Sequence, residues 1–480
     1  MDKTYLISQS TSLSLVIVIS LIFIALGLYH SRKFKGINNY HTANRNIGLF
    51  SLTTSLVASA LGAWILFGPA AAATWGGIGA VIGYALGTAF PMIFLIYLGK
   101  KIRTDFPRGS SLIEFMRKKF GKNLFKLILL MTIFYMFIFL CAEVTAVAVL
   151  INFISGTELW ITALIVLLAT LAYTLYGGLR ASIFTDNIQM IVIVVLLLIS
   201  AIYIFSFTGN EFSFEFVKEK NPQLLSWSYV PSYTAGLTFF IAVAATNLFH
   251  QGNWQRVYAA KDQQTLKKSL IISFFIIIPI VFFMGFAGMV SFSIDPGNRP
   301  DLGFFTLLLK EQTEWLSLII VVLGLALTIS TVDTLVNAIS SLFVVDGKAT
   351  FNFNKKTDYL RLSKYFIIFL SLIAFLIASK GFDILYLFLL ADLFCCAFVF
   401  TVFYSFYNKN INEKTAYISI VVGLIGGFLL FPFPDFSKSL LVGILMPKEI
   451  FPPFVGQSLL FLSFAVATFL PFFIFKAKKF

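Results

Sequence analysis

Residues 326–346 read ALTISTVDTLVNAISSLFVVD, a stretch apolar enough to span a membrane but interrupted by polar residues. A helix places four of these residues on one face, at spacings of i, i+3, i+4 and i+7: Leu327, Ser330, Thr331 and Thr334. Two neighbouring hydroxyls below a helical carbonyl form a cluster of hard oxygen ligands, which suits a small alkali cation. Asp333 adds an ionisable side chain, and because burying a charge in a membrane is costly, such a residue indicates a functional site.

Packing is the alternative explanation of this polar stripe. Ser and Thr in membrane helices often bond the carbonyl four residues back and allow close helix packing. We prefer that interpretation for Ser340 and Ser341. For Ser330, Thr331 and Asp333 taken together, we prefer a cation site.

The composition indicates an all-α polytopic membrane protein. Of the 480 residues, 59% are hydrophobic and only 12% are charged, and long apolar runs recur along the whole chain. These runs do not alternate apolar and polar residues, which excludes a membrane β-barrel. Cys141, Cys395 and Cys396 all lie inside apolar runs, so they form neither a disulfide framework nor a zinc motif.

The apolar runs predict thirteen transmembrane helices of roughly twenty residues. The first run lacks a basic n-region and a small-residue cleavage site, so we interpret it as a retained helix and not as a signal peptide. The predicted spans are 12–30, 50–74, 78–99, 124–154, 159–176, 184–207, 232–251, 268–293, 315–345, 364–379, 382–407, 416–433 and 455–475.

Basic residues predict the orientation. With the N-terminus outside and the C-terminus in the cytoplasm, 28 of the 36 Lys and Arg fall in inside segments, as the positive-inside rule requires. The net charge of +14 then reflects topology, and no nucleic-acid partner is needed. A bacterial inner (plasma) membrane is the expected location. Within the loop 100–123, residues 110–120 favour a short amphipathic helix on the inner leaflet, with a solvated linker as the alternative.

Two predicted spans carry helix-breaking residues at matching positions. The second contains Gly62, Gly68 and Pro69, and the seventh ends in the polar stretch 247–256. The two spans lie five apart, which is typical of transporters built from two inverted five-helix repeats. Interrupted helices expose backbone groups, and these are tolerated inside a membrane only where they line a cavity.

At these residues the chain resembles the sodium:solute symporter family, which includes sodium-coupled proline, sugar, sialic acid, pantothenate and urea transporters. The resemblance covers roughly residues 10–475. It rests on four stretches: 55–64 with Gly68 and Pro69, 176–189 (YGGLRASIFTDNIQ), 255–262 (QRVYAAKD) and Ser330 through Asp346.

The resemblance implies a leucine-transporter-type fold with broken first and sixth core helices. Residues 1–480 would form a single transmembrane transporter domain. Its expected parts are a peripheral first helix at 12–30, inverted repeats at 50–207 and 232–407, and two peripheral helices within 416–475.

The resemblance also implies a sodium site that joins the second span to the ninth. Ala58, Leu61 and Leu327 would supply carbonyl oxygens, and Ser330 and Thr331 would supply hydroxyls. Na⁺ is the only bound ion or cofactor expected. Some members of the family have a second cation site, which by position would fall on Asp186, Ser330, Asp333 and Thr334. Alternatively, Asp186 is a helix N-cap or a partner of Arg180.

The solute is expected to bind between the two breaks. The residues expected to line the cavity are Ser59, Ala60, Trp64, Asn247, Gln251 and Asp392. Sugar-transporting relatives have Asn and proline-transporting relatives Asp at the Ala60 position, so Ala60 favours neither solute. Trp64 matches the proline type, with packing as the alternative. For His250, we prefer an interfacial position over a gate at the inner end of the cavity.

Two intramembrane carboxylates, Glu143 and Asp392, need a partner, a proton or a cationic ligand. Together they could bind an ammonium or amide group of the solute, or each could bond a neighbouring helix. The stretches 249–256 and 391–395 are similar to those of the urea and polyamine branch.

The sequence therefore predicts a secondary active transporter that carries a small polar organic solute into the cell with Na⁺ by alternating access. Its expected partners are the solute, the sodium ion and the lipid bilayer, with no obligate protein partner. The alternative is a proton-coupled or uncoupled transporter that uses the intramembrane carboxylates. An enzyme is not expected, because the three histidines are scattered and no nucleotide loop or catalytic triad is evident.

Overall fold

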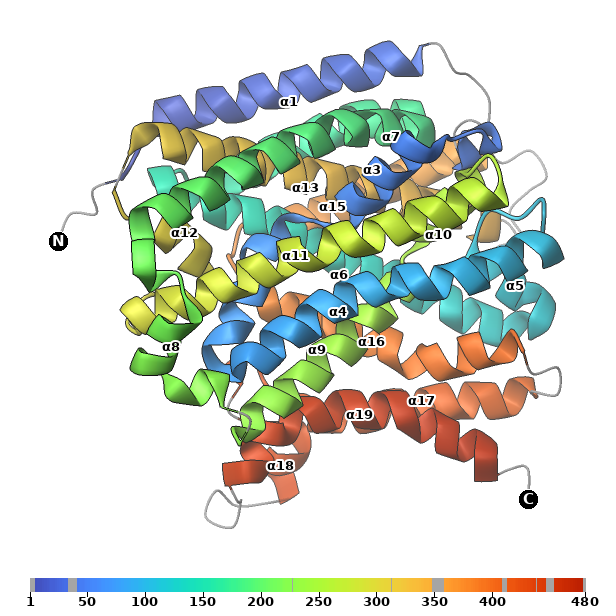
Figure 1. The fold of residues 1–480 in the computed structure, drawn as a ribbon. Helices are drawn as coiled ribbons and strands as arrows, with labels where there is room; N and C mark the ends of the chain where they lie inside the picture. Colours follow the sequence, from blue (N-terminus) through green and yellow to red (C-terminus); the bar gives the residue numbers. More distant parts are fainter. Residues whose placement is uncertain are drawn as a thin grey trace.

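The computed structural model describes residues 5–32, 41–226, 228–311, 313–347, 358–407, 412–436, 438–445 and 453–477. Within these residues every regular element is a helix, and β-pairing is limited to two isolated bridges, Ile47–Ala260 and Pro432–Ser439 (Figure 1). The helices are α1 (Gln9–Ser31), η1 (Ala43–Arg45), α3 (Leu49–Ala60), η2 (Ala63–Leu66), α4 (Gly68–Asp105), α5 (Leu112–Lys119), α6 (Lys122–Ser155), α7 (Leu159–Thr208), η3 (Gly209–Glu211), α8 (Phe214–Lys220), η4 (Pro222–Leu225), α9 (Val230–Phe249), α10 (Gln251–Ala259), α11 (Gln263–Ile294), η5 (Pro300–Leu302), α12 (Gly303–Leu308), α13 (Glu314–Leu342), the π-helical η6 (Phe343–Gly347), α15 (Tyr359–Ala378), α16 (Ile384–Ser405), α17 (Glu413–Leu430), α18 (Leu440–Leu445) and α19 (Pro453–Ala477).

The chain is a multi-span membrane protein. Eleven helices in its described part are long and apolar enough to cross a bilayer, namely α1, α4, α6, α7, α9, α11, α13, α15, α16, α17 and α19. The shorter α3 is apolar but has only 12 residues.

Two glycines divide the longest helices. Gly77 in α4 (φ 52°, ψ −151°) and Gly178 in α7 (φ 61°, ψ −156°) each join two helices through a backbone conformation that side chains disfavour. At about 1.5 Å per residue, a straight helix of 50 residues would measure roughly 75 Å, well beyond a hydrocarbon core of about 30 Å, so α7 is longer than a single span requires. The total of thirteen spans stays a prediction.

The second predicted span is interrupted where its glycines and proline stand. Helix α3 ends at Ala60, Leu61 and Gly62 are non-helical, and the short η2 follows. Helix α4 then starts at Gly68, with Pro69 in its first turn, where the missing amide proton of proline does no harm. The break exposes backbone groups in the middle of the molecule.

The seventh predicted span is also interrupted. Helix α9 ends at Phe249, His250 adopts an extended conformation (φ −60°, ψ 107°), and α10 begins at Gln251. Side-chain bonds close the gap, because Asn253 Nδ2 donates to the Asn247 carbonyl at 2.9 Å and Trp254 Nε1 donates to the Leu248 carbonyl at 2.7 Å.

The polar loop after α4 contains the expected amphipathic helix. Helix α5 is capped by Ser111, whose Oγ accepts from the Glu114 amide at 2.9 Å, and three basic residues lie in its last turn. Its apolar residues, including Phe115 and Met116, are buried against the bundle.

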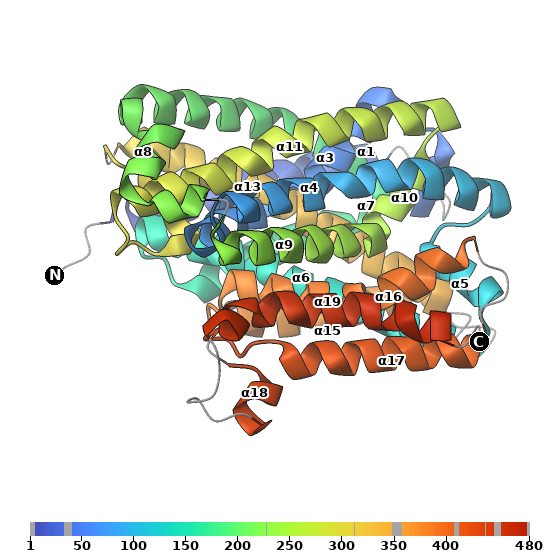
Figure 2. The same ribbon diagram turned by 60° about the horizontal axis from the view of Figure 1, so that its bottom comes forward.

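Helix α13 lies at the centre of the bundle, and every residue from Leu323 to Leu342 is buried. It packs against α3, α6 and α7, while α4 packs against α9 and α11. Helix α1 lies along α7 at one edge of the molecule (Figure 1). Helices α17 and α19 pack together at the opposite edge (Figures 1 and 2). The polar stripe of α13 therefore lies in the protein interior.

Candidate functional site

The polar stripe of α13 is fully buried. Leu327, Ser330 and Thr331 are each 0% exposed and Thr334 is 1% exposed. Thr331 Oγ1 donates to the Leu327 carbonyl at 3.2 Å, the back-bond of a helical threonine. Ser330 Oγ instead donates to another helix, reaching Asp186 Oδ1 at 2.7 Å. The lone pairs of both hydroxyls remain available as ligands.

The end of α3 presents backbone oxygens near this stripe. Its last backbone bond runs from the Leu61 amide to the Val57 carbonyl, so the next carbonyls, from Ala58 to Leu61, lie beyond the helical ladder. Helix α3 contacts α13, and Ala58 and Leu61 are fully buried. The five expected sodium ligands thus come from two touching elements, and five neutral oxygens are a donor set that fits Na⁺.

A buried ion pair lies beside this cluster. Arg256 Nη2, on α10, is 2.7 Å from Asp186 Oδ2, on α7, and both side chains are completely buried. Asp186 Oδ2 also accepts from Ser55 Oγ at 2.6 Å. Arg256 further donates to Ser55 Oγ at 2.7 Å, to Thr334 Oγ1 at 2.9 Å and to the Gly252 carbonyl at 3.1 Å. One guanidinium therefore joins α3, α7, α10 and α13.

Both alternative roles considered for Asp186 are wrong. Asp186 lies inside α7, eight residues beyond the Gly178 kink, so it is not an N-cap. Its ion-pair partner is Arg256, whereas Arg180 donates to the Ala43 carbonyl at 3.2 Å. Arg256 was not among the predicted site residues. The sequence signals for it were its place directly after the break in the seventh span and its presence in the stretch 255–262 that carries part of the family resemblance.

Asp333 is surrounded by hydroxyls. Its Oδ2 accepts from Tyr173 OH at 2.5 Å and from Thr185 Oγ1 at 3.2 Å. Its Oδ1 accepts from Ser182 Oγ at 2.7 Å and, more weakly, from Thr334 Oγ1 at 3.4 Å. Thr334 therefore lies between Asp333 and the guanidinium of Arg256.

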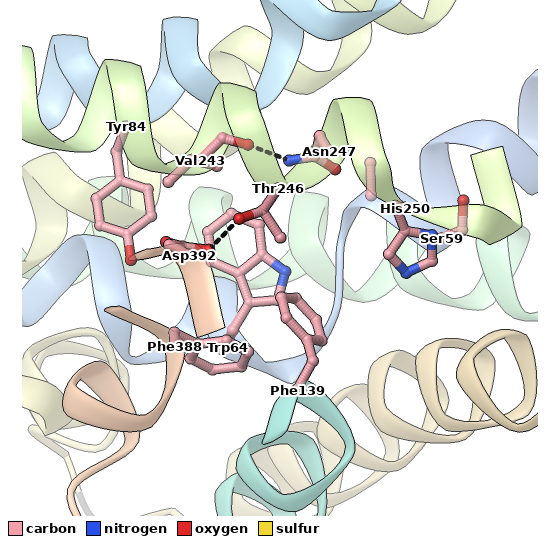
Figure 3. A pocket seen from close by; sticks show the side chains of 11 residues that line it. Ser59, Trp64, Tyr84, Phe139, Val243, Thr246, Asn247, His250, Phe388 and Asp392 are labelled. Carbon is pink, nitrogen blue, oxygen red and sulfur yellow. Dashed lines mark hydrogen bonds between the residues drawn. The ribbon is translucent and has the colours of Figure 1, made fainter. Parts of the chain in front are cut away.

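A pocket lies between the two broken helices (Figure 3). It is narrow in this conformation, with a cavity volume of about 20 Å³. Its lining residues are Ser59, Ala60, Trp64, Tyr84, Phe139, Val243, Thr246, Asn247, His250, Phe388 and Asp392. Five of the residues expected to bind the solute are in this list: Ser59, Ala60, Trp64, Asn247 and Asp392.

Aromatic rings and one carboxylate dominate this pocket. The Trp64 ring stacks on Tyr84 with centroids 5.6 Å apart and meets Phe388 edge-on at 6.4 Å. Phe139 packs edge-on against Phe388 at 4.6 Å. Asp392 is 4% exposed, and its Oδ1 accepts from Thr246 Oγ1 at 2.5 Å (Figure 3).

Two expected solute ligands lie elsewhere. Glu143 Oε2 accepts from the Ala63 amide at 2.9 Å, so this carboxylate binds the broken helix and does not line the pocket. Gln251 Nε2 donates to the Ser110 carbonyl at 3.0 Å and is also outside the lining. The preferred interpretation of His250 is wrong, because this side chain is 3% exposed and lines the pocket instead of lying at an interface.

The segment before α3 closes one end of the bundle. The Ile47 amide donates to the Ala259 carbonyl at 3.0 Å, and the Lys261 amide donates to the Ile47 carbonyl at 3.1 Å. Arg45 donates to the Pro107 and Gly109 carbonyls at 2.6 and 2.7 Å and lies over the Tyr258 ring. Burial raises the pKa of Tyr258 above its usual range, so the phenol stays neutral.

Comparison with known proteins identifies the family. A family model described as the sodium:solute symporter family matches residues 40–423. A spermidine transporter of Candida albicans, DUR31, is 26% identical over 383 residues, which cover 79% of this chain and 72% of that protein. The sodium/glucose cotransporter 4 of Mus musculus is 23% identical over 478 residues, covering 86% and 68% respectively.

Solved structures share the fold. A Na⁺-coupled sialic acid symporter in a substrate-bound outward-open state matches with a TM-score of 0.72 at 17% identity, over 96% of this chain and 98% of that one. MhsT in complex with L-phenylalanine matches with a TM-score of 0.54 at 15% identity, over 90% and 99%. These neighbours have the leucine-transporter-type fold, and the family and its neighbours are transporters, not enzymes.

Proposed function

The chain belongs to the sodium:solute symporter family, and on that premise we propose that it moves a small amine-bearing solute into the cell together with Na⁺. The observation that supports this proposal best is the arrangement of polar groups around the break between α3 and α4. Oxygen ligands for a cation lie on one side of the break, and a pocket with a carboxylate lies on the other.

Na⁺ binds, in this proposal, to the carbonyls of Ala58, Leu61 and Leu327 and to the hydroxyls of Ser330 and Thr331. Five neutral oxygens hold a monovalent cation weakly enough to exchange. Binding joins α3 to α13 and so favours one of the two states of an alternating-access cycle. At a membrane potential of about 100 mV, each inward charge contributes roughly 2.3 kcal/mol to solute accumulation.

A second Na⁺ site on Asp186, Ser330, Asp333 and Thr334 would compete with Arg256 in this conformation. The guanidinium already donates to Asp186 and Thr334, at 2.7 and 2.9 Å. We therefore propose a single Na⁺ as the coupling ion. A second ion would require Arg256 to leave the cluster.

The chemistry of the pocket favours a protonated amine as the solute. Asp392 supplies a negative charge, and aromatic rings such as those of Trp64, Phe139 and Phe388 attract a cation through their quadrupoles. Tyr84 contributes less, because it is stacked against Trp64 and Phe239. The relative from Candida albicans is a spermidine transporter, which agrees with this chemistry. His250, at the end of the pocket, adds a polar group that could accept a further N–H.

For the topology we propose thirteen spans, with the N-terminus outside and the C-terminus in the cytoplasm of a bacterial inner membrane. The kinks at Gly77 and Gly178 support this number. Dividing α7 at Gly178 gives two helices of bilayer length, and the short piece of α4 before Gly77 completes the second span together with α3 and η2. Residues 50–207 and 232–407 form the two inverted repeats of a single transporter domain, and 12–30 and 416–475 are peripheral. The end closed by Arg45 and Tyr258 then faces the cytoplasm.

Uptake into proteoliposomes tests this proposal. Radiolabelled spermidine, putrescine, urea, proline and glucose are offered with an inward gradient of Na⁺, of K⁺ or of protons. We expect accumulation of an amine only with the Na⁺ gradient. Accumulation driven by protons instead would transfer the coupling role to the buried carboxylates, and Na⁺-driven uptake of a neutral solute would refute the proposed role of Asp392.

A further inference from the structure

One short segment of the chain serves both proposed sites. Between residues 58 and 64, the carbonyls of Ala58 and Leu61 belong to the sodium site. Ser59, Ala60 and Trp64 line the solute pocket. Whatever fixes the path of this segment therefore affects the ion and the solute at once.

Glu143 holds this segment at its non-helical centre. The side chain comes from α6 and is 0% exposed, and its Oε2 accepts from the Ala63 amide at 2.9 Å. Ala63 follows the non-helical pair Leu61 and Gly62 and opens η2, so its amide has no helical partner. The carboxylate supplies that partner from a neighbouring helix.

Gly62 allows the close approach of this carboxylate. A Cβ atom built on Gly62 would overlap Glu143 Oε1 and would lie 2.8 Å from both Glu143 Cδ and Trp64 Cδ1. Backbone and carboxylate are therefore in contact with no space between them. A movement of the Glu143 side chain toward Gly62 therefore displaces Gly62. This residue lies between Leu61, whose carbonyl is a proposed Na⁺ ligand, and Trp64, which lines the pocket.

The surroundings of Glu143 do not compensate for the cost of burying its carboxylate, so stability of the fold alone does not explain this residue. Its Oε1 is buried without a hydrogen-bond partner, which costs free energy. The ion pairs found among the described residues do not include Glu143, although such a pair would offset its burial. It also lies outside the pocket lining, so it is not a direct solute ligand.

We propose that Glu143 is a positioning residue that couples the sodium site to the solute pocket by holding the unwound segment between them. Na⁺ at the Leu61 carbonyl and solute at Trp64 each favour the same path of this segment. Because Glu143 fixes that path, binding of one ligand prepares the site of the other. This inference rests on the proposed Na⁺-coupled function.

Two substitutions separate this role from packing. Glu143→Gln keeps an oxygen that can accept from the Ala63 amide, whereas Glu143→Leu fills similar space without an acceptor. Thr145→Val is the matched control, because Thr145 lies on the same helix, is equally buried and bonds only the Cys141 carbonyl of that helix. Each purified variant is tested for binding of ²²Na⁺ alone, and for binding of spermidine with and without Na⁺.

We expect Glu143→Leu to weaken ²²Na⁺ binding and to reduce the effect of Na⁺ on spermidine affinity. Each change should be at least about fivefold, which is the lower end of the range usual for coupling between two binding sites. Glu143→Gln and Thr145→Val should stay within about twofold of the wild type. A Glu143→Leu protein that melts like the control yet keeps wild-type coupling would overturn the inference, as would a Glu143→Gln protein no better than Glu143→Leu. If the wild type binds no ²²Na⁺, the proposed function fails. If it binds Na⁺ but not spermidine, the amine proposal fails and the ²²Na⁺ measurement still tests Glu143.

Discussion

Replacing Asp186 by Asn is expected to destabilise the protein strongly, because it leaves the guanidinium of Arg256 buried without a counter-charge. The two groups are 2.7 Å apart and neither side chain is exposed to solvent. The amide of Asn can still accept from Ser55 or Ser330, so the hydrogen bonds are partly kept and the main loss is the charge.

The size of the effect follows from burial. Removing one partner of a buried ion pair costs about 3–5 kcal/mol, whereas removing both charges together costs much less. The double variant Asp186→Asn/Arg256→Met should therefore be more stable than Asp186→Asn alone. The exposed pair of Lys310 and Glu211 has the same 2.7 Å separation but 40% and 37% exposure, so Lys310→Met should cost only about 0–1 kcal/mol.

Reversible unfolding in mixed detergent micelles measures these free energies for the four proteins. The expected order of stability is wild type and Lys310→Met highest, the double variant intermediate and Asp186→Asn lowest. An Asp186→Asn protein as stable as Lys310→Met would refute the reasoning, because the pair would then be solvated or absent in the native state.

Three further substitutions test the sites directly. Thr331→Ala removes one of the five proposed ligands and should raise the Na⁺ concentration for half-maximal uptake by about tenfold or more. The control Thr328→Ala, on the same helix, should leave that concentration unchanged. Equal effects of the two variants would count against the ion site. Asp392→Asn should raise the KM for spermidine and leave the Na⁺ dependence unchanged, and an unaltered KM would return Asp392 to a packing role. Arg45→Ala removes two carbonyl bonds and should speed hydrogen exchange at the Ile47 amide, whereas unchanged exchange would show that other contacts keep this end closed.

The breaks in the helices were predictable from the sequence because their causes are local. Gly62 and Pro69 interrupt an apolar run, and the helix ends just before Gly62 and starts again beside Pro69. The stripe of Ser330, Thr331 and Thr334 was predictable because helical periodicity alone places these residues together.

The partners of the buried charges were not predictable, because they come from distant parts of the chain. Asp186 and Arg256 are 70 residues apart in sequence, and Tyr173 is 160 residues from its partner Asp333. Neither separation leaves a periodic signal. Only the packing of α7, α10 and α13 brings these groups together.

The same limit explains the misplaced solute ligands. An intramembrane carboxylate indicates a functional site, but the sequence does not show which groups the side chain contacts. Glu143 and Asp392 therefore looked equivalent in the sequence. In the fold, Asp392 lines the pocket and Glu143 binds the backbone of the broken helix. The aromatic walls formed by Tyr84, Phe139 and Phe388 were missed because 57 phenylalanines and 18 tyrosines give no means of choosing among them.

The most direct test of Na⁺-coupled symport is to ask whether the solute can drive the ion. Proteoliposomes are prepared with equal Na⁺ on both sides and a trace of ²²Na⁺ outside, and an inward gradient of spermidine is then imposed with the membrane potential clamped to zero. Symport predicts a transient accumulation of ²²Na⁺ above equilibrium, which Thr331→Ala should weaken. Spermidine entry with no movement of ²²Na⁺ against its gradient would contradict the account.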